Sequence, residues 1–198
     1  MNKVGVRVNR KEVIFEAAVQ CFNENGYYTT SMDMIADEAG MTKRGLYYHF
    51  KSKDQLFIEL FHYMNRKYYE RIPEFASPEH SPEGRLRMFV EIAGAVLREN
   101  VDFLKFSQEF MTIGVRKPEI RAVMSASYAD QVKRVQVIIE EGIAAGQFIQ
   151  VDTEKTARSI VLITIGVFTV YFSLDDDFDY IDQHAFNIEQ IIQAIKKA

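Results

Sequence analysis

The stretch from residue 29 to residue 53 constrains the fold more tightly than any other part of the sequence. Ile35 and its small neighbours can form the inner face of a short helix. Gly40 then ends that helix, because glycine enters the left-handed conformation of a tight turn at little cost. Leu46 and Phe50 lie four positions apart, so both can point inward from a second short helix. The sequence therefore predicts two short helices joined by a glycine turn.

The second of these helices carries a basic and aromatic outer face. Thr42 can cap its start by accepting a backbone N–H with its hydroxyl oxygen. The side chains left on the outer faces are Lys43, Arg44, Tyr47, Tyr48 and His49. Two short helices around a glycine turn, the second with such a face, are typical of a helix-turn-helix, whose second helix fits the major groove of DNA.

Across this stretch the sequence resembles the TetR family of bacterial transcriptional regulators. The residues that carry the resemblance are Ile35, Ala36, Ala39, Gly40, Thr42, Leu46, Tyr47, Tyr48, His49, Phe50, Lys53 and Leu56. The segment from Glu141 to Ala157, which contains the turn at Gly146, also resembles the family. In the family this segment leads into the helix pair through which two subunits dimerise.

The resemblance implies an all-α protein with an N-terminal three-helix DNA-binding domain of the helix-turn-helix type at 1–53. A fourth helix, 53–72, would connect it to a larger C-terminal helical ligand-binding and dimerisation domain at 73–198. The implied function is a ligand-responsive transcriptional regulator, namely a dimeric repressor that a small-molecule inducer releases from a palindromic double-stranded DNA operator. The alternative is an all-helical small-molecule-binding protein or enzyme whose head does not read DNA.

The residues expected to contact DNA are Thr30, Ser31, Thr42, Lys43, Arg44, Gly45, Tyr47, Tyr48, His49 and Lys53. Lys43 and Arg44 can each donate to guanine O6 and N7, and Arg44 can do so with two donors at once. The resemblance implies that Tyr47 touches a base. It implies phosphate contacts, which set register rather than sequence preference, for Thr30, Ser31, Tyr48, His49 and Lys53. The alternatives are a solvated helix face for the two cations and partial core packing for one of the two tyrosines.

Two positions depart from the family pattern. Arg44 occupies the place of a frequent glycine, and Asp33 stands where a basic residue is frequent. Because an acidic side chain cannot hold a phosphate, we expect Asp33 to form a capping box with Thr30 at the start of the first motif helix. The operator sequence therefore cannot be copied from relatives.

The charge is distributed unevenly along the chain. The whole chain carries a net charge of −4, whereas residues 1–72 carry +2 and residues 73–198 carry −6. A mildly basic head on an acidic body favours DNA contact by one end rather than by the whole surface. We also expect residues 1–8, with Lys3 and Arg7, to form a flexible arm.

Cysteine content and apolar runs bear on the compartment. The single cysteine, Cys21, excludes an internal disulfide framework and is expected to be a small core residue. Residues 2–11 are polar and basic, so we expect no signal peptide. The longest apolar run, Ile160–Leu174, is shorter than the roughly 18–20 residues that cross a bilayer. These features predict a cytoplasmic protein without a membrane partner.

Helical periodicity continues through the rest of the chain, and no stretch alternates with the period of a strand. The helices expected outside the motif cover about 9–25, 52–71, 82–99, 101–113, 118–145, 153–174 and 183–197. Gly26 should end the first of them, and the proline-containing stretch 73–82 is the expected linker between domains.

The C-terminal helices are rich in aromatic and methionine side chains. The resemblance implies a pocket for a small effector there, and this composition indicates a mainly apolar one. The residues expected to line it are Phe89, Phe103, Phe106, Phe110, Met111, Met124, Tyr128, Phe168 and Tyr171. For any one of them the alternative is simple core packing.

Two apolar helices near the C-terminus need to be buried on several sides. The run Ile160–Leu174 is apolar nearly all round, and Ile188, Ile191, Ile192 and Ile195 form a stripe at helical spacing. Pairing with the same helices of a second subunit would bury both segments, and an intrachain core is the alternative.

The sequence indicates no metal site, cofactor or catalytic centre. Asp175, Asp177 and Asp179 lack the glycine and glutamate that a calcium loop of the EF-hand type needs, so we expect a solvated acidic loop. The histidines show no paired ligand spacing, and phosphate-binding glycine loops and nucleophile motifs are missing from the sequence. We therefore do not expect an enzyme.

Overall fold

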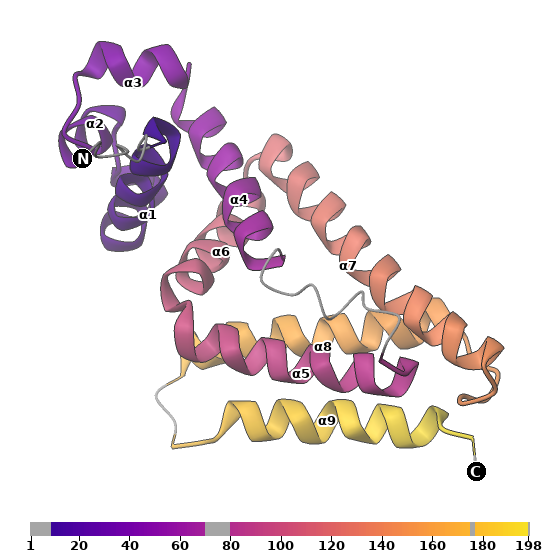
Figure 1. Ribbon diagram of the computed structural model, residues 1–198. Helices are drawn as coiled ribbons and strands as arrows, with labels where there is room; N and C mark the ends of the chain where they lie inside the picture. The colour runs from indigo at the N-terminus through magenta and orange to yellow at the C-terminus, as the bar shows by residue number, and fades with distance from the viewer. Residues whose placement is uncertain (1–8, 70–79, 175–176, 198) are drawn as a thin grey trace, which may run out of the picture.

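The computed structural model describes residues 9–69, 80–174 and 177–197, and helices make up almost all of them (Figure 1). The helices are α1 (Arg10–Thr29), α2 (Met32–Glu38), α3 (Lys43–His49), α4 (Lys53–Tyr69), α5 (Pro82–Glu99), α6 (Val101–Gly114), α7 (Pro118–Ala144), α8 (Thr153–Ser173) and α9 (Tyr180–Ile195). The all-α prediction is confirmed. The predicted arm at 1–8 and residues 73–79 of the predicted linker lie outside the described residues.

Local polar contacts explain where two helices differ from the prediction. Gly26 has a φ of +73° and kinks α1, but a further helical turn follows it to Thr29. The last helix begins at Tyr180, ahead of the predicted start at 183. It begins there because Asp179 Oδ1 accepts the backbone N–H groups of residues 181 and 182 at 3.0 Å and 2.9 Å.

One hydrophobic core, called here the head core, joins α1–α4 to α6 and the start of α7. Its largest fully buried side chains are Phe22, Phe50, Phe57, Phe106 and Phe110. The ring centroids of Phe57 and Phe106 lie 5.0 Å apart, and those of Phe61 and Phe110 lie 4.1 Å apart. Helix α6 therefore packs with the N-terminal helices although it follows them after a long interval in the sequence.

A second core, called the body core, lies among α5, α7, α8 and α9. It contains Ile139, Ile160, Ile188 and Ile192, each of which is fully buried. For the isoleucine stripe of α9, the intrachain alternative therefore holds, since these side chains pack within the subunit.

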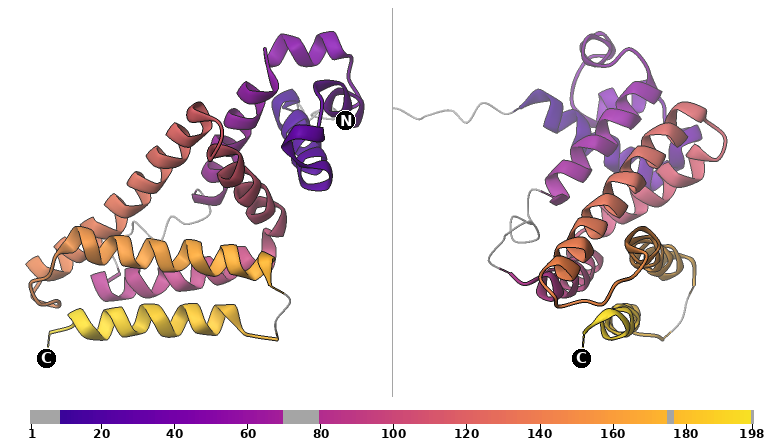
Figure 2. Two further views of the ribbon diagram at one scale, coloured as in Figure 1. Left: turned by 180° about the vertical axis from the view of Figure 1, so that it is seen from behind. Right: turned by 90° about the vertical axis from the view of Figure 1, so that its right-hand side faces the viewer.

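The helices form two parts that α4, α6 and α7 connect. Figures 1 and 2 show α1–α3 grouped at one end, with α4 leading away from them and α7 sloping toward the far end. There α5, α8 and α9 run side by side, and α7 packs along α8.

Helix α8 is long and apolar enough to cross a membrane by length and composition alone. Its residues Ala157, Ile160 and Val161 are fully buried in the body core, and Glu154, Lys155 and Arg158 occupy its first turns. One face of α8 therefore packs in the body core, while 22% of the residues in its apolar window are buried.

Candidate DNA-binding head and ligand cavity

Helices α2 and α3 form the two arms of the predicted helix-turn-helix. The Oγ of Ser31 accepts Met34 N–H at 3.2 Å to start α2, and Oγ1 of Thr42 accepts Gly45 N–H at 3.1 Å to start α3. Between them Gly40 has a φ of +61°, as its predicted role in the turn requires. The capping role predicted for Thr42 is confirmed, and Ser31 takes the role predicted for Thr30.

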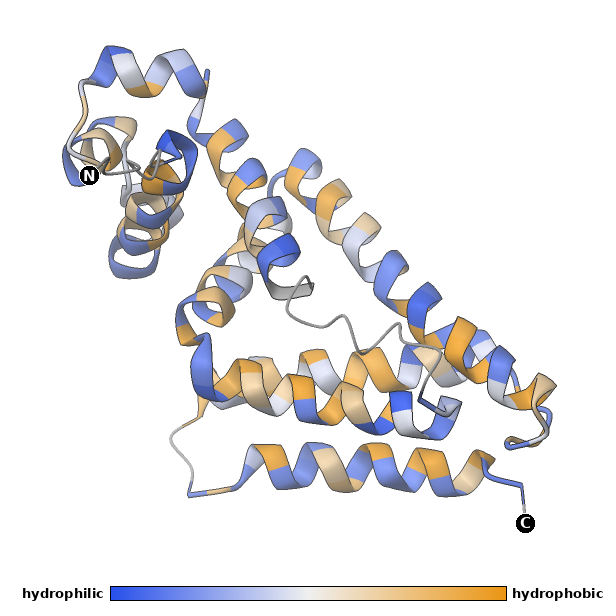
Figure 3. Ribbon diagram, viewed as in Figure 1, coloured by the Kyte–Doolittle hydropathy of each residue, from blue (hydrophilic) through white to orange (hydrophobic). Residues whose placement is uncertain are grey.

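The outer face of α3 is exposed to solvent, and its inner face is buried in the head core. Leu46 and Phe50 are fully buried in the head core, whereas Arg44 is exposed. Tyr48 is 80% exposed and Tyr47 is 39% exposed, so neither tyrosine packs in the core. Figure 3 shows α3 as a mostly hydrophilic helix, in contrast to the apolar α8. A rigidly held helix thus presents a cation and two aromatic rings outward.

An ion pair joins the first residues of the two motif helices. The Nζ of Lys43 lies 2.7 Å from Oδ2 of Asp33, and both side chains are more than half exposed. The hydrogen bond to this carboxylate and its charge raise the pKa of Lys43. The capping role predicted for Asp33 is wrong, since it pairs with Lys43 instead. An exposed pair of this kind contributes little to stability, so DNA can compete for Lys43.

Thr30 does not face the solvent, which corrects its predicted phosphate contact. Its side chain is 1% exposed, and Oγ1 donates to the carbonyl oxygens of Gly26 at 2.8 Å and Cys21 at 2.9 Å. The Gly26 carbonyl oxygen also accepts the backbone N–H of Thr30 at 3.2 Å, so the buried hydroxyl is engaged within the head. Ser31, by contrast, is exposed at the start of α2.

Lys53 also has a structural role in place of the predicted phosphate contact. Its Nζ donates to the carbonyl oxygens of Tyr27 at 2.5 Å and Thr30 at 2.6 Å, and it lies 4.4 Å from the centroid of the Tyr27 ring. Burial, together with the nearby charge of Lys117, lowers the pKa of Lys53. Lys53 therefore fastens the turn between α1 and α2 to the start of α4.

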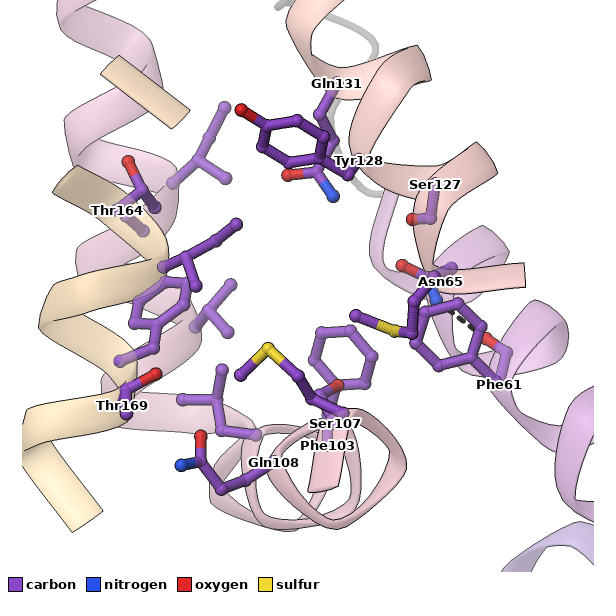
Figure 4. A pocket seen from close by; sticks show the side chains of 18 of the residues that line it. Phe61, Asn65, Phe103, Ser107, Gln108, Ser127, Tyr128, Gln131, Thr164 and Thr169 are labelled. Carbon is purple, nitrogen blue, oxygen red and sulfur yellow. Dashed lines mark hydrogen bonds between the residues drawn. The ribbon is translucent and has the colours of Figure 1, made fainter. Parts of the chain in front are cut away.

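The body encloses a cavity of about 190 Å³ between α4, α5, α6, α7 and α8 (Figure 4). Six of the nine residues predicted to line a pocket do line it, namely Phe89, Phe103, Met111, Met124, Tyr128 and Phe168. Figure 4 shows Tyr128 and Phe103 reaching the space from α7 and α6, with Thr164 and Thr169 of α8 on the opposite side.

Three predicted cavity residues lie elsewhere. Phe106 and Phe110 are fully buried in the head core, on the face of α6 that turns away from the cavity. Tyr171 is 39% exposed and packs against the rings of Phe172 and Tyr180. The periodicity of α6 gives it two apolar faces, and the sequence does not say which one meets the head.

Polar side chains around the cavity were missed by reasoning from composition. They are Asn65, Ser107, Gln108, Ser127, Gln131, Arg134, Thr164 and Thr169. Ser107 follows the predicted residue Phe103 by one helical turn, so helical spacing could have found it. The Oγ of Ser107 is buried and has no hydrogen-bond partner among the described residues. A ligand group could supply that partner.

A buried hydrogen bond links the cavity wall to α9. The Nε2 of His184 lies 2.8 Å from Oγ1 of Thr164, which also donates to the carbonyl oxygen of Ile160 at 3.0 Å. Burial lowers the pKa of His184 to about 4, so the ring is neutral at physiological pH. This pair ties α8 to α9 in a single protonation state.

Among the described residues, no three histidine, cysteine, aspartate or glutamate side chains gather as a metal site would need. Of the acidic loop considered for calcium, Asp175 lies outside the described residues, while Asp179 caps α9.

Known proteins resemble this chain in the head and along its whole length. The family model for "Bacterial regulatory proteins, tetR family" matches residues 14–60, which run from α1 into α4. The uncharacterized HTH-type transcriptional regulator YhgD of Bacillus subtilis is 27% identical over 182 residues, which cover 89% of this chain and 87% of the relative.

Solved structures share the fold. A TetR transcription regulator from Haloarcula marismortui matches with a TM-score of 0.85 and 23% identity, over 95% of this chain and 98% of that one. The transcriptional regulator FadR from Bacillus subtilis, solved in complex with stearoyl-CoA, matches with a TM-score of 0.79 and 22% identity, over 93% and 98% of the two chains. With its helix-turn-helix head on a helical body, this chain belongs to the TetR family of bacterial transcriptional regulators.

Proposed function

We propose that the protein is a dimeric transcriptional repressor in the cytoplasm, which a small-molecule effector releases from a palindromic operator. The observation that carries the proposal is the outer face of α3, where an exposed cation and two exposed tyrosines stand on a helix held from beneath by Leu46 and Phe50. Burial of the inner face fixes the orientation of the outer one, as base recognition demands.

Within that face we assign different roles to different residues. Arg44 is the base-reading cation, with Tyr47 beside it for apolar contact with a thymine methyl group. Lys43 joins them when DNA displaces Asp33. The residues proposed for phosphate contact are now Ser31, Thr42, Tyr48 and His49, because Thr30 and Lys53 are engaged within the head.

The dimer is proposed on the side of the body where apolar side chains stay exposed. Leu162 of α8 is 56% exposed and Phe186 of α9 is 58% exposed, while the isoleucines of α9 face inward. Exposed large apolar groups on two adjacent helices favour association with a like surface. Two heads related by a two-fold axis would meet half-sites about 34–36 Å apart or a multiple of this distance.

Helix α6 supports a route by which an effector would act on DNA binding. One face of α6 lines the cavity with Ser107 and Met111, and the adjacent face places Phe106 and Phe110 in the head core. An effector that favours a shifted α6 would therefore shift the head as well. The change in DNA affinity is limited by how strongly the effector prefers that state.

A direct hydrogen bond adds to this route. The Oε1 of Glu109, on α6, accepts the backbone N–H of Tyr27 at 2.7 Å. Tyr27 is 2% exposed, and the Nζ atoms of Lys53 and Lys117 lie 4.4 Å and 5.2 Å from the centroid of its ring. Tyr27 thus stands where α6, α4 and the turn before α2 meet.

The DNA-binding part is tested by selection from randomised duplexes, followed by affinity measurements on the selected site. We expect a two-fold symmetric site. Arg44→Ala should weaken binding to it by about 1–3 kcal/mol with relaxed preference at one base pair. Lys133→Ala, which removes an exposed cation from body helix α7, is the matched control and should bind as the wild type does. Failure to select any site would leave a ligand-binding protein whose head only packs.

A further inference from the structure

Polar and apolar side chains both line the cavity. Helices α5 and α8 bring Phe89 and Phe168, and α6 brings Phe103. The polar groups Asn65, Ser127, Gln131 and Arg134 come from α4 and α7. Figure 4 shows Asn65, Ser127 and Gln131 together on the side of the cavity formed by these two helices. A bound molecule therefore meets both apolar surface and hydrogen-bonding groups, and the polar groups of α4 and α7 lie together on one wall.

Next to this polar wall the surface is hollowed by a cleft of about 400 Å³ between α4 and α7. The cleft and the cavity share four lining residues, namely Phe61, Asn65, Ser127 and Arg134. The two spaces therefore adjoin one another along these side chains.

The cleft is lined by more basic than acidic side chains. Arg66 of α4 and Arg134 of α7 contribute two guanidinium groups, and His62 adds an imidazole. The acidic residue of the lining is Asp130, whose Oδ2 lies 2.8 Å from Nε of Arg134 within α7. Guanidinium groups suit carboxylate and phosphate groups because they present several N–H donors in one plane.

From this arrangement we propose that the effector is an amphipathic anion. Its hydrocarbon part occupies the cavity, and its carboxylate or phosphate head lies in the α4–α7 cleft against Arg66 and Arg134. The inference rests on the proposed effector-binding function and specifies the chemical class of that effector.

The size of the cavity guides the choice of probes. Its volume of about 190 Å³ is below the roughly 300–1,000 Å³ of ordinary ligand pockets, so a ten-carbon chain is a suitable starting length. The probes are decanoate, 1-decanol and decyltrimethylammonium, which differ in the charge of the head group. Decanoyl-CoA is a fourth probe that separates a free acid from a thioester with phosphate groups. Binding is measured by calorimetry on the full chain without DNA.

We expect decanoate or decanoyl-CoA to bind at least about tenfold more tightly than decanol, and the cation to bind most weakly. We expect the affinity for the anion to fall by about tenfold or more in Arg66→Ala, in Arg134→Ala and in the double variant. The affinity for decanol should change by less than about twofold in the same variants. Asp130→Asn should tighten anion binding, because it removes a like charge from the cleft. Lys133→Ala, next to Arg134 but outside the cleft, is the matched control.

A cavity variant tests where the chain lies. Ser107→Phe fills the space and should abolish binding of decanoate and decanol alike. The proposal is overturned if decanol or the cation binds as tightly as the anions, if the arginine variants weaken all probes equally, or if none of the probes binds. Because DNA binding is measured separately on the ligand-free protein, these failures leave the test of the regulator itself intact.

Discussion

Glu109 offers the sharpest perturbation of the contact between head and body. Its carboxylate is acceptor to the Tyr27 N–H at 2.7 Å, and Tyr27 is 2% exposed. Glu109→Ala leaves that buried N–H without its acceptor, which costs about 1–3 kcal/mol. Burial raises the pKa of Glu109, so removing the charge also relieves some unfavourable desolvation. We therefore expect a net loss of about 1–2 kcal/mol in the free energy of unfolding at pH 7.

Glu109→Gln separates the hydrogen bond from the charge. The amide keeps an oxygen that can accept the Tyr27 N–H, so we expect stability within about 0.5 kcal/mol of the wild type at pH 7. The raised pKa means that the folded state favours the protonated acid. Stability from this group is therefore present below the ordinary pKa of a glutamate and is lost as the pH rises through the folded-state pKa. The free energy of unfolding of the glutamine variant, relative to that of the wild type, should therefore increase as the pH rises.

Urea denaturation followed by circular dichroism measures these differences. Lys105→Ala, at an exposed position of α6, is the matched control and should leave stability unchanged. If the alanine variant at 109 is as stable as this control, the Tyr27 contact does not hold the head to α6. In that case the hydrogen bond between Glu109 and Tyr27 is not part of the proposed route from the cavity to the DNA-binding head.

Three further outcomes follow from single contacts. Asp33→Asn should raise DNA affinity about two- to tenfold, because it removes a carboxylate from the DNA-facing side and releases Lys43. The wild type should lose up to about 3 kcal/mol of stability as the pH falls from 6.5 to 4, because His184 has a folded-state pKa of about 4, and His184→Leu should lack that loss. Gly142→Ala should cost about 2–4 kcal/mol, since a Cβ there would lie 2.1 Å from Cδ2 of the buried Phe148 ring.

A specific result would contradict each of these three predictions. Equal or weaker DNA binding by the asparagine variant at 33 would mean that the carboxylate itself contacts the operator. His62→Gln replaces an exposed histidine and is the control for the acid titration. A loss at low pH that persists in the leucine variant at 184 would assign it to other groups. Wild-type thermal stability of the alanine variant at 142 would show that Phe148 can move without cost.

The sequence predicted the architecture well because that architecture depends on local signals. Gly40 and Thr42 determine the turn and the second cap from their own chemistry, and the helices follow from apolar periodicity. The predictions that were wrong concern side chains whose positions depend on tertiary contacts. The Thr30 hydroxyl is turned inward to backbone carbonyls beside the kink in α1, and Lys53 is held by carbonyls brought to it by folding. Periodicity could not tell which of the neighbouring apolar residues of α6, such as Phe103 and Phe106, would line the cavity.

The most direct test of the central claim is DNA binding by the purified protein at near-physiological salt. A duplex from beside its own gene is compared with a scrambled duplex by fluorescence anisotropy, first alone and then with decanoate or decanoyl-CoA added. Our account predicts selective binding by a dimer, weaker binding as salt rises, and release by the added anion. Equal affinity for the two duplexes, followed by failure to select any site from a randomised pool, would contradict it.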